Sequence, residues 1–282
     1  MVTRFVEALY PDWRQTFENV RLLHRETTPF QELAVYETPG FGTLLALDGV
    51  VQTTTADEFV YHEMIVHPAF VAHGAARAVL VVGGGDGGCL REILKHPVER
   101  VVLAEIDARV VEVSKTFLPG LSAGAFDDPR VEVRIGDGLA YVAETQEKFD
   151  VIVVDSTDPE GPGEALFTEA FYADCARILN PRGVVVTQSG VPFRQPRGLA
   201  LSYRRLKSAF ADVTFAACAV PTYVGGVMAL GWASQDPSLR RLGVESLRTV
   251  AAARGLATRY YTPEVHLAAF ALPRYIQELL VP

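Results

Sequence analysis

Hydrophobic positions follow two different patterns along the chain, one before residue 56 and another after residue 74. In the first part, short segments such as ELAVYET alternate apolar and polar positions, and turn-forming residues separate them. One of these turns is Asp48-Gly49, and Asp-Gly between apolar runs is a strong hairpin signal. The pattern predicts a small antiparallel sheet, with Trp13 and Phe17 in its core.

After residue 74 the apolar runs become continuous and alternate with segments of helical spacing. Runs without polar alternation are typical of parallel strands that helices cover on both faces. We expect strands at residues 78–83, 100–107, 130–137, 149–156 and 182–189, a hairpin from ADVTFAACAV to VGGVMALGWA, and a helix over residues 56–72 that begins at a Thr-rich cap. The predicted architecture is α/β, with a β-strand domain over residues 1–55 and a doubly wound domain over residues 56–282.

The charge balance and the number of cysteines limit the possible binding partners and the cellular compartment. Among 282 residues, 26 Lys and Arg stand against 34 Asp and Glu, a net charge of −8, which argues against a nucleic-acid partner. Three scattered cysteines are too few for a disulfide framework or a zinc cluster. No apolar run approaches the roughly 18 residues of a membrane span, and the first residues lack a secretory signal. We therefore expect a cytoplasmic protein without a membrane partner.

A glycine-rich loop follows the strand expected at residues 78–83. Gly83, Gly85 and Gly88 satisfy the G-x-G-x-x-G spacing between this strand and a helical segment. Glu105 lies twenty residues after Gly85, at the end of the next strand, where an acid can accept hydrogen bonds from ribose hydroxyls. A purely structural tight turn is the alternative, but the strand, the helix and Glu105 together favour nucleoside binding.

The charges around this loop favour a cationic nucleoside. Asp86 at the centre of the loop would repel a pyrophosphate, which a dinucleotide places at such a helix N-terminus. Asp137 ends a third strand, where it can meet an adenine amino group while Gly138 leaves room for the ring. A sulfonium nucleoside of the S-adenosylmethionine type fits this set of acids better than NAD does.

A second acidic cluster follows the strand expected at residues 149–156. Asp155 and Asp158 lie on a Pro/Gly-rich loop, just outside the carboxyl end of that strand, where ligands bind in open α/β sheets. For Asp155 the alternative is an ordinary turn-forming or capping role. Together with Asp86, these acids would form a strongly negative cleft, which a polyamine or another organic cation would relieve.

The segment His62-Glu63-Met64-Ile65-Val66-His67 is close to the zinc motif H-E-x-x-H but has one residue too many. Histidines five positions apart lie about 140° from alignment on a helix, so they do not readily share one metal. We therefore expect no metal site here.

Several segments together resemble the spermidine synthases, the polyamine aminopropyltransferases, in order and spacing. They are LALDGVVQTTTADEFVYHEM, VLVVGGGDGG, LAEID, IGDG, VVDSTDPEGPGEALFTEAFY and PTYVGG, and the likeness extends to RYYTPEVHLAAFALP. The resemblance implies a small N-terminal β domain before a Rossmann-like, methyltransferase-type domain. It also implies transfer of an aminopropyl group from decarboxylated S-adenosylmethionine to putrescine, giving spermidine and methylthioadenosine.

The resemblance further implies roles for individual residues. Asp155 is the expected proton acceptor, with Tyr61 and Tyr223 as further catalytic groups, and the polyamine is held by His62, Asp86, Asp155 and Asp158. The nucleoside donor is expected at Gln31, Gly83, Gly85, Asp86, Glu105, Asp137, Gly138 and Pro162. The donor is a co-substrate, so no cofactor is expected, and the family forms dimers or tetramers. The family often begins with Trp-x-Glu, whereas this chain has Phe5-Val6-Glu7, so the first dozen residues receive no role.

Two other functions remain open on the same fold. One is an S-adenosylmethionine-dependent methyltransferase, because a fold does not determine a function. The other is a non-catalytic protein that binds polyamines or nucleosides. The choice of acceptor among putrescine, cadaverine and spermidine also stays open, because discrimination by one methylene is worth only about 1–3 kcal/mol.

Overall fold

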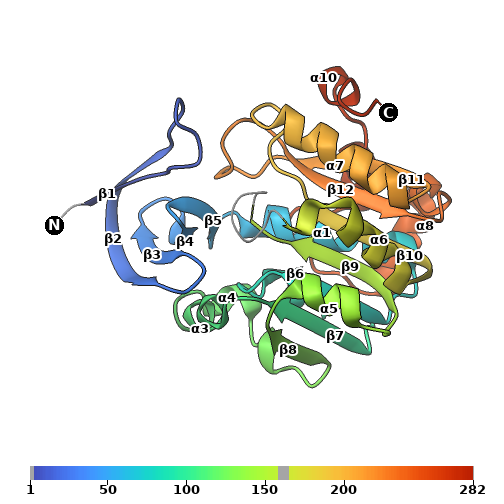
Figure 1. Ribbon diagram of the computed structural model, residues 1–282, viewed down its shortest axis with the longest axis horizontal. Helices are drawn as coiled ribbons and strands as arrows, with labels where there is room; N and C mark the ends of the chain where they lie inside the picture. The colour runs from blue at the N-terminus through green and yellow to red at the C-terminus, as the bar shows by residue number, and fades with distance from the viewer. Residues whose placement is uncertain (1–2, 158–164, 282) are drawn as a thin grey trace.

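The computed structural model describes residues 3–157 and 165–281, and Figure 1 shows its two sheets beside each other. The first is antiparallel and ordered β1 to β5, drawn in blue: β1 (Thr3–Val6), β2 (Thr16–Thr27), β3 (Glu32–Thr38), β4 (Gly42–Leu47) and β5 (Val50–Thr54). Asp48 and Gly49 both have positive φ angles, of 49° and 75°, as the two-residue turn of a hairpin requires. The predicted N-terminal antiparallel sheet is therefore confirmed.

The second sheet has seven strands in the order β11-β12-β10-β9-β6-β7-β8. They are β6 (Ala78–Gly83), β7 (Arg100–Glu105), β8 (Val131–Ile135), β9 (Phe149–Asp155), β10 (Leu179–Gln188), β11 (Asp212–Cys218) and β12 (Met228–Ser234). β8, β7, β6, β9 and β10 are parallel, while β12 runs antiparallel to both β10 and β11. The five continuous apolar runs and the later hairpin thus form the strands that the sequence predicts.

Helices cover both faces of the central strands, which explains why those strands show no polar alternation. The edge strand β8, with the sequence VEVRI, alternates apolar and polar residues and is only partly covered. Along β6, Val79 and Val81 pack in one buried cluster with α1 (Glu58–His73), while Leu80 and Val82 pack in another with α6 (Glu169–Ile178). The other helices are α2 (Gly88–Ile93), α3 (Ala108–Phe117), α4 (Pro119–Ser122), α5 (Gly138–Glu144), α7 (Pro196–Ala209), α8 (Val244–Ala253), α9 (Pro263–Ala269) and α10 (Arg274–Gln277). None of the described helices is long and apolar enough to cross a bilayer.

Two local expectations are wrong. Trp13 does not enter the core of the first sheet: it lies before β2, is 42% exposed and stacks near Arg194, whereas Phe17 is buried as expected. The Thr-rich cap of α1 is also absent, because the helix begins after Asp57 without a side-chain cap. Thr54 instead donates a hydrogen bond to Asp57, whose other oxygen accepts from the backbone and hydroxyl of Thr222.

The strand order reverses direction between β6 and β9, and the predicted site residues gather there. Gly83 at the end of β6 pairs with Asp155 at the end of β9. The first sheet packs against the same region, since Leu45 and Val35 share a buried cluster with Val110 and Leu121 of α3 and α4. A ligand at this switch point of an open α/β sheet is therefore enclosed by both sheets.

Candidate active site

One cavity of about 640 Å³ opens at this switch point, between the two sheets. Every predicted site residue that the structure describes lines it: Gln31, Tyr61, His62, Gly83, Gly85, Asp86, Glu105, Asp137, Gly138, Asp155 and Tyr223. Asp158 and Pro162 lie outside the described residues. Residues as far apart in the chain as Gln31 and Tyr223 thus contribute to a single pocket of the size that holds a small molecule.

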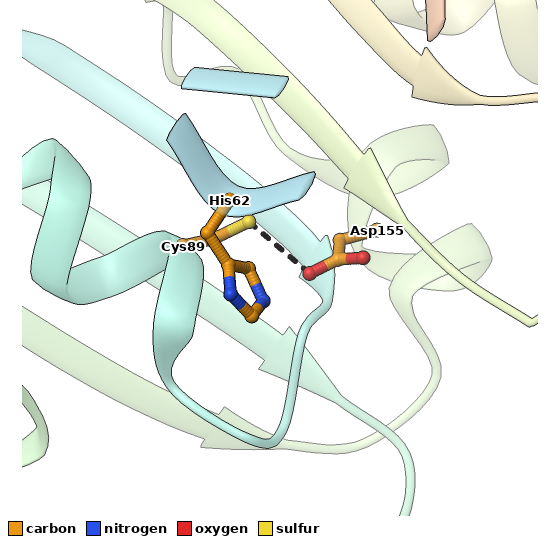
Figure 2. A group of neighbouring side chains, drawn as sticks. All are labelled: His62, Cys89 and Asp155. Carbon is orange, nitrogen blue, oxygen red and sulfur yellow. Dashed lines mark hydrogen bonds between the residues drawn. The ribbon is translucent and has the colours of Figure 1, made fainter. Parts of the chain in front are cut away.

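Asp155 is held from two sides at the end of β9. The Tyr61 hydroxyl donates to Asp155 Oδ1 over 2.6 Å. The Cys89 thiol donates to Oδ2 over 3.1 Å, as Figure 2 shows. Among the residues that the structure describes, its carboxylate bonds with side chains of α1 and α2, which gives Asp155 a role beyond turn formation. Burial and the Asp86 carboxylate raise the pKa of Asp155 above its usual value. A carboxylate with a raised pKa accepts a proton more readily than an exposed one.

Two tyrosines, the buried Tyr61 and the half-buried Tyr223, lie next to Asp155. The rings of Tyr61 and Tyr223 meet edge to face with centroids 5.9 Å apart, and the Tyr223 hydroxyl donates to the Gln52 carbonyl over 2.6 Å. Burial and the Asp155 charge raise the pKa of both hydroxyls well above the usual value, so both stay protonated. Because each hydroxyl proton is already donated within the protein, the oxygen lone pairs remain to accept N–H groups of a bound amine.

Glu105 is a further acid that lines the cavity. It is 7% exposed at the end of β7, and its Oε1 accepts from the Asp107 backbone over 2.9 Å. A Cβ at Gly85 would come within 2.8 Å of the Glu105 carboxylate. The absence of a side chain at Gly85 therefore makes room for this carboxylate, and not for a phosphate. Burial and the nearby Asp107 charge raise the pKa of Glu105 to about 7. Gln31 reaches the same corner and donates to Asp107 over 3.1 Å.

Asp137 and Gly138 lie at the start of α5, and part of their role is structural. Asp137 caps this helix by accepting from the Leu139 backbone over 2.8 Å. A Cβ at Gly138 would meet Val82 at 2.6 Å, so the glycine lets α5 pack closely on β6. Because both residues also line the cavity, the close packing brings the helix N-terminus to the edge of the pocket.

The last glycine of the motif makes room for His62. A Cβ at Gly88 would lie 2.2 Å from Cε1 and 2.4 Å from Nδ1 of the His62 ring. Asp86 accepts a hydrogen bond from the Gly88 backbone over 2.8 Å, and its other oxygen lies 3.4 Å from His62 Nε2. The glycine-rich loop is thus shaped by the side chains around it.

Replacing Gly88 by Ala is expected to displace the His62 ring. The added methyl group has to move a side chain that is 2% exposed, and overpacking of this kind costs about 1–3 kcal/mol of folding stability. The change is measured by thermal unfolding together with turnover. A Gly120→Ala variant serves as the control, because its Cβ would meet nothing within 4 Å. Equal melting temperatures for the two variants would contradict the close packing.

Potential metal ligands also meet in this cavity. The ligand atoms of His62, Cys89 and Asp155 lie within 4.8 Å of one another, as Figure 2 shows. Burial and the Asp155 carboxylate raise the pKa of the Cys89 thiol well above its usual value, whereas zinc binds the thiolate. His67 points elsewhere and bonds with His96 and Glu92 instead of sharing partners with His62. Hydrogen bonds of His62 with Glu58 and of Cys89 with Asp155 hold these side chains in this arrangement.

Sequence reasoning missed several residues that line or support the cavity. Glu7 is buried, accepts from the Val51 backbone over 3.0 Å and lines the cavity, although no role was expected in the first dozen residues. Glu7 is the glutamate of the Phe5-Val6-Glu7 segment. The partial match of this segment to the family's Trp-x-Glu start was the signal that could have identified Glu7. Cys89 and Glu58 carried no such signal, because their contacts with Asp155 and His62 depend on helix packing.

The geometry agrees with comparisons to known proteins. The spermine/spermidine synthase domain matches residues 58–242, and the spermidine synthase tetramerisation domain matches residues 5–55. The chain belongs to the spermine/spermidine synthase family. It is 52% identical to the polyamine aminopropyltransferase of Pseudomonas syringae pv. tomato over 96% of each chain. It is 51% identical to polyamine aminopropyltransferase 1 of Pseudomonas aeruginosa over 98% of this chain and 97% of that one.

Solved structures of the family share the fold of this chain. Thermotoga maritima spermidine synthase superposes with a TM-score of 0.91 at 35% identity, over 99% of this chain and 94% of that one. A spermidine synthase in complex with the transition-state analogue AdoDATO gives a TM-score of 0.93 at 35% identity, with the same coverage. The expected Rossmann-like, methyltransferase-type domain is confirmed, and the protein is a member of an aminopropyl-transferring enzyme family.

Proposed function

We propose that this protein transfers the aminopropyl group of decarboxylated S-adenosylmethionine to putrescine, giving spermidine and methylthioadenosine. The observation that carries the proposal is the position of Asp155. This carboxylate is held by Tyr61 and Cys89 in the same cavity that Glu105 and Tyr223 line. The donor is consumed in the reaction and is thus a co-substrate, so the proposal requires no cofactor.

In the proposed reaction, the amine nitrogen attacks the methylene carbon next to the sulfonium. The new C–N bond forms as the C–S bond breaks, and the electron pair of that bond stays on sulfur as a neutral thioether. The leaving group therefore needs no acid, and the protein has to orient the two substrates and accept one proton from the amine. Asp155 takes this proton, while Tyr61 and Tyr223 accept amine N–H groups and align the lone pair. Alignment of this kind is worth several kcal/mol.

Asp86 supplies a reason for the choice of donor. It belongs to the glycine-rich loop and lines the cavity beside His62, where the aminopropyl tail of the donor approaches the acceptor. Intact S-adenosylmethionine carries a carboxylate on this tail, which Asp86 would repel, whereas the decarboxylated form carries only an ammonium group. Repulsion of a competing ligand is an effective source of specificity.

One assay tests the proposal and ranks the acceptors. Purified protein is mixed with decarboxylated S-adenosylmethionine and putrescine, cadaverine or spermidine, and methylthioadenosine release is measured by chromatography. We expect the fastest release with putrescine and none with intact S-adenosylmethionine as donor. Methyl transfer from the intact donor would instead indicate a methyltransferase. Tight binding of the nucleoside without any product would indicate a non-catalytic binding protein.

We also propose that the chain acts as a homo-oligomer, a dimer or a tetramer. The support is the match of residues 5–55 to the family's tetramerisation domain, which covers the first sheet in Figure 1. Light scattering during gel filtration is expected to give a mass that is two or four times 30.8 kDa. A monomer at micromolar concentration that retains full activity would contradict this proposal.

A further inference from the structure

The ring of His62 lies between two carboxylates in the part of the cavity next to Asp155. Its Nδ1 is 2.6 Å from Glu58 Oε2, and its Nε2 is 3.4 Å from Asp86 Oδ2. A neutral imidazole carries a single N–H and can donate to only one of these acceptors, whereas an imidazolium donates to both. The contacts on both nitrogens therefore fit a protonated ring.

Glu58 is itself fixed from behind. Arg91 of α2 binds both of its oxygens, over 3.1 Å and 2.8 Å, and the Glu58 side chain is 8% exposed. The backbone of Gly88 packs directly against the ring, because a Cβ at this position would overlap with the ring atoms. Burial alone would lower the pKa of His62, but the Asp86 and Glu58 charges outweigh it and raise this pKa well above the usual value. The ring thus has a fixed orientation and two anionic partners.

We propose that Glu58 is a positioning residue that holds His62 as a permanent imidazolium, and that this cation favours the unprotonated, nucleophilic form of the amine bound at Asp155. The inference rests on the proposed function, which supplies the amine. It explains a difficulty of the reaction, because a carboxylate alone would keep a bound amine protonated. The imidazolium supplies the opposing charge from the protein.

The distances make this effect substantial. His62 and Asp155 have ligand atoms within 4.8 Å, so an amine on Asp155 lies only a few ångströms from the imidazolium. Within residues 3–157 and 165–281, the charged or titratable groups around the ring are Glu58 and Tyr61 of α1, Asp86 of the loop, Cys89 and Arg91 of α2, and Asp155 of β9. At such separations and an effective protein dielectric constant of about 20, one positive charge lowers the pKa of a bound amine by about one to two units.

The protonation state of His62 is tested first, without any substrate. Nitrogen-15 NMR of protein labelled at its six histidines reports whether each ring nitrogen carries a proton, and the His62→Gln spectrum assigns the signal. We expect His62 to remain doubly protonated at about pH 8, well above the ordinary histidine pKa of about 6.5. Glu58→Gln removes one anionic partner, so the pKa of His62 should fall. A wild-type His62 that is neutral at this pH overturns the inference.

The effect on the amine is tested by the pH dependence of single-turnover rates at saturating substrate. Without the imidazolium the bound amine holds its proton more tightly, so higher pH is needed to free its lone pair. The acid limb of the rate profile should move upward by about one to two pH units in His62→Gln and by less in Glu58→Gln. A defect that is equal at all pH values would indicate a merely structural role and overturn the inference.

A Glu245→Gln variant is the matched control, because Glu245 is 80% exposed on α8 and pairs only with surface groups in the described contacts. It should leave the profile unchanged. If no methylthioadenosine forms at all, the proposed function fails, and the charge effect is then read from diamine binding to the complex with methylthioadenosine. Calorimetry in buffers of different ionisation enthalpy should count more protons released by the wild type than by His62→Gln. Equal counts overturn the inference.

Discussion

Asp155→Asn is expected to lower the turnover of this protein by about 10²–10⁴-fold, the usual contribution of a general base. The amide keeps the shape of the side chain and can still accept from the Tyr61 hydroxyl, which lies 2.6 Å from Oδ1. It cannot accept the amine proton, however, so the chemical step slows while binding persists. Single-turnover kinetics measure the step, and calorimetry with methylthioadenosine measures the affinity.

The control for this variant is Asp127→Asn, the same substitution at a carboxylate that is 77% exposed and pairs with Lys115. Its turnover should equal that of the wild type. Full activity of Asp155→Asn would exclude Asp155 as the proton acceptor. Loss of nucleoside affinity in the same variant would show that Asp155 acts in binding instead.

Glu105→Gln is expected to weaken methylthioadenosine binding by about 10²-fold at pH 8, because hydrogen bonds to a charged acceptor are worth about 1.5–3 kcal/mol each. Only the ionised carboxylate accepts from both ribose hydroxyls. Since the pKa of Glu105 in the free protein is about 7, wild-type affinity should be highest above this pH and fall as the pH drops through it. The variant should show a flat profile, which calorimetry across the pH range measures.

The same substitution should stabilise the protein without ligand. The folded-state pKa of Glu105 lies above the ordinary value, so ionisation of this buried group opposes folding, and the loss of stability develops as the pH rises from about 4.5 through about 7. Glu105→Gln should therefore melt at a higher temperature than the wild type at pH 8. Glu37→Gln, at an exposed acid paired with Arg21, is the control. A lower melting temperature for Glu105→Gln would contradict the burial cost.

Much of the fold follows from short-range patterns. The apolar runs at β6, β7 and β9 match the strands nearly to the residue, because strands that are covered on both faces need uninterrupted apolar sequence. The prediction that Trp13 lies in the core is wrong, because the alternation of apolar and polar residues in one segment does not determine which flanking aromatic residue is buried.

The sequence by itself determined the positions of the chemical groups along the chain. Each acid of the predicted site that the structure describes follows a strand, and the carboxyl ends of parallel strands lie at one edge of a sheet. This rule was enough to place Asp86, Glu105, Asp137 and Asp155 around a single cavity.

Only the tertiary structure decided what these groups touch and which charge they carry. The thiol of Cys89 on Asp155, the ring of His62 against Gly88, and Glu58 behind that ring join segments whose packing no local pattern encodes. The pKa values of these groups depend on burial and on neighbouring charges within a few ångströms, so they exist only in the folded molecule.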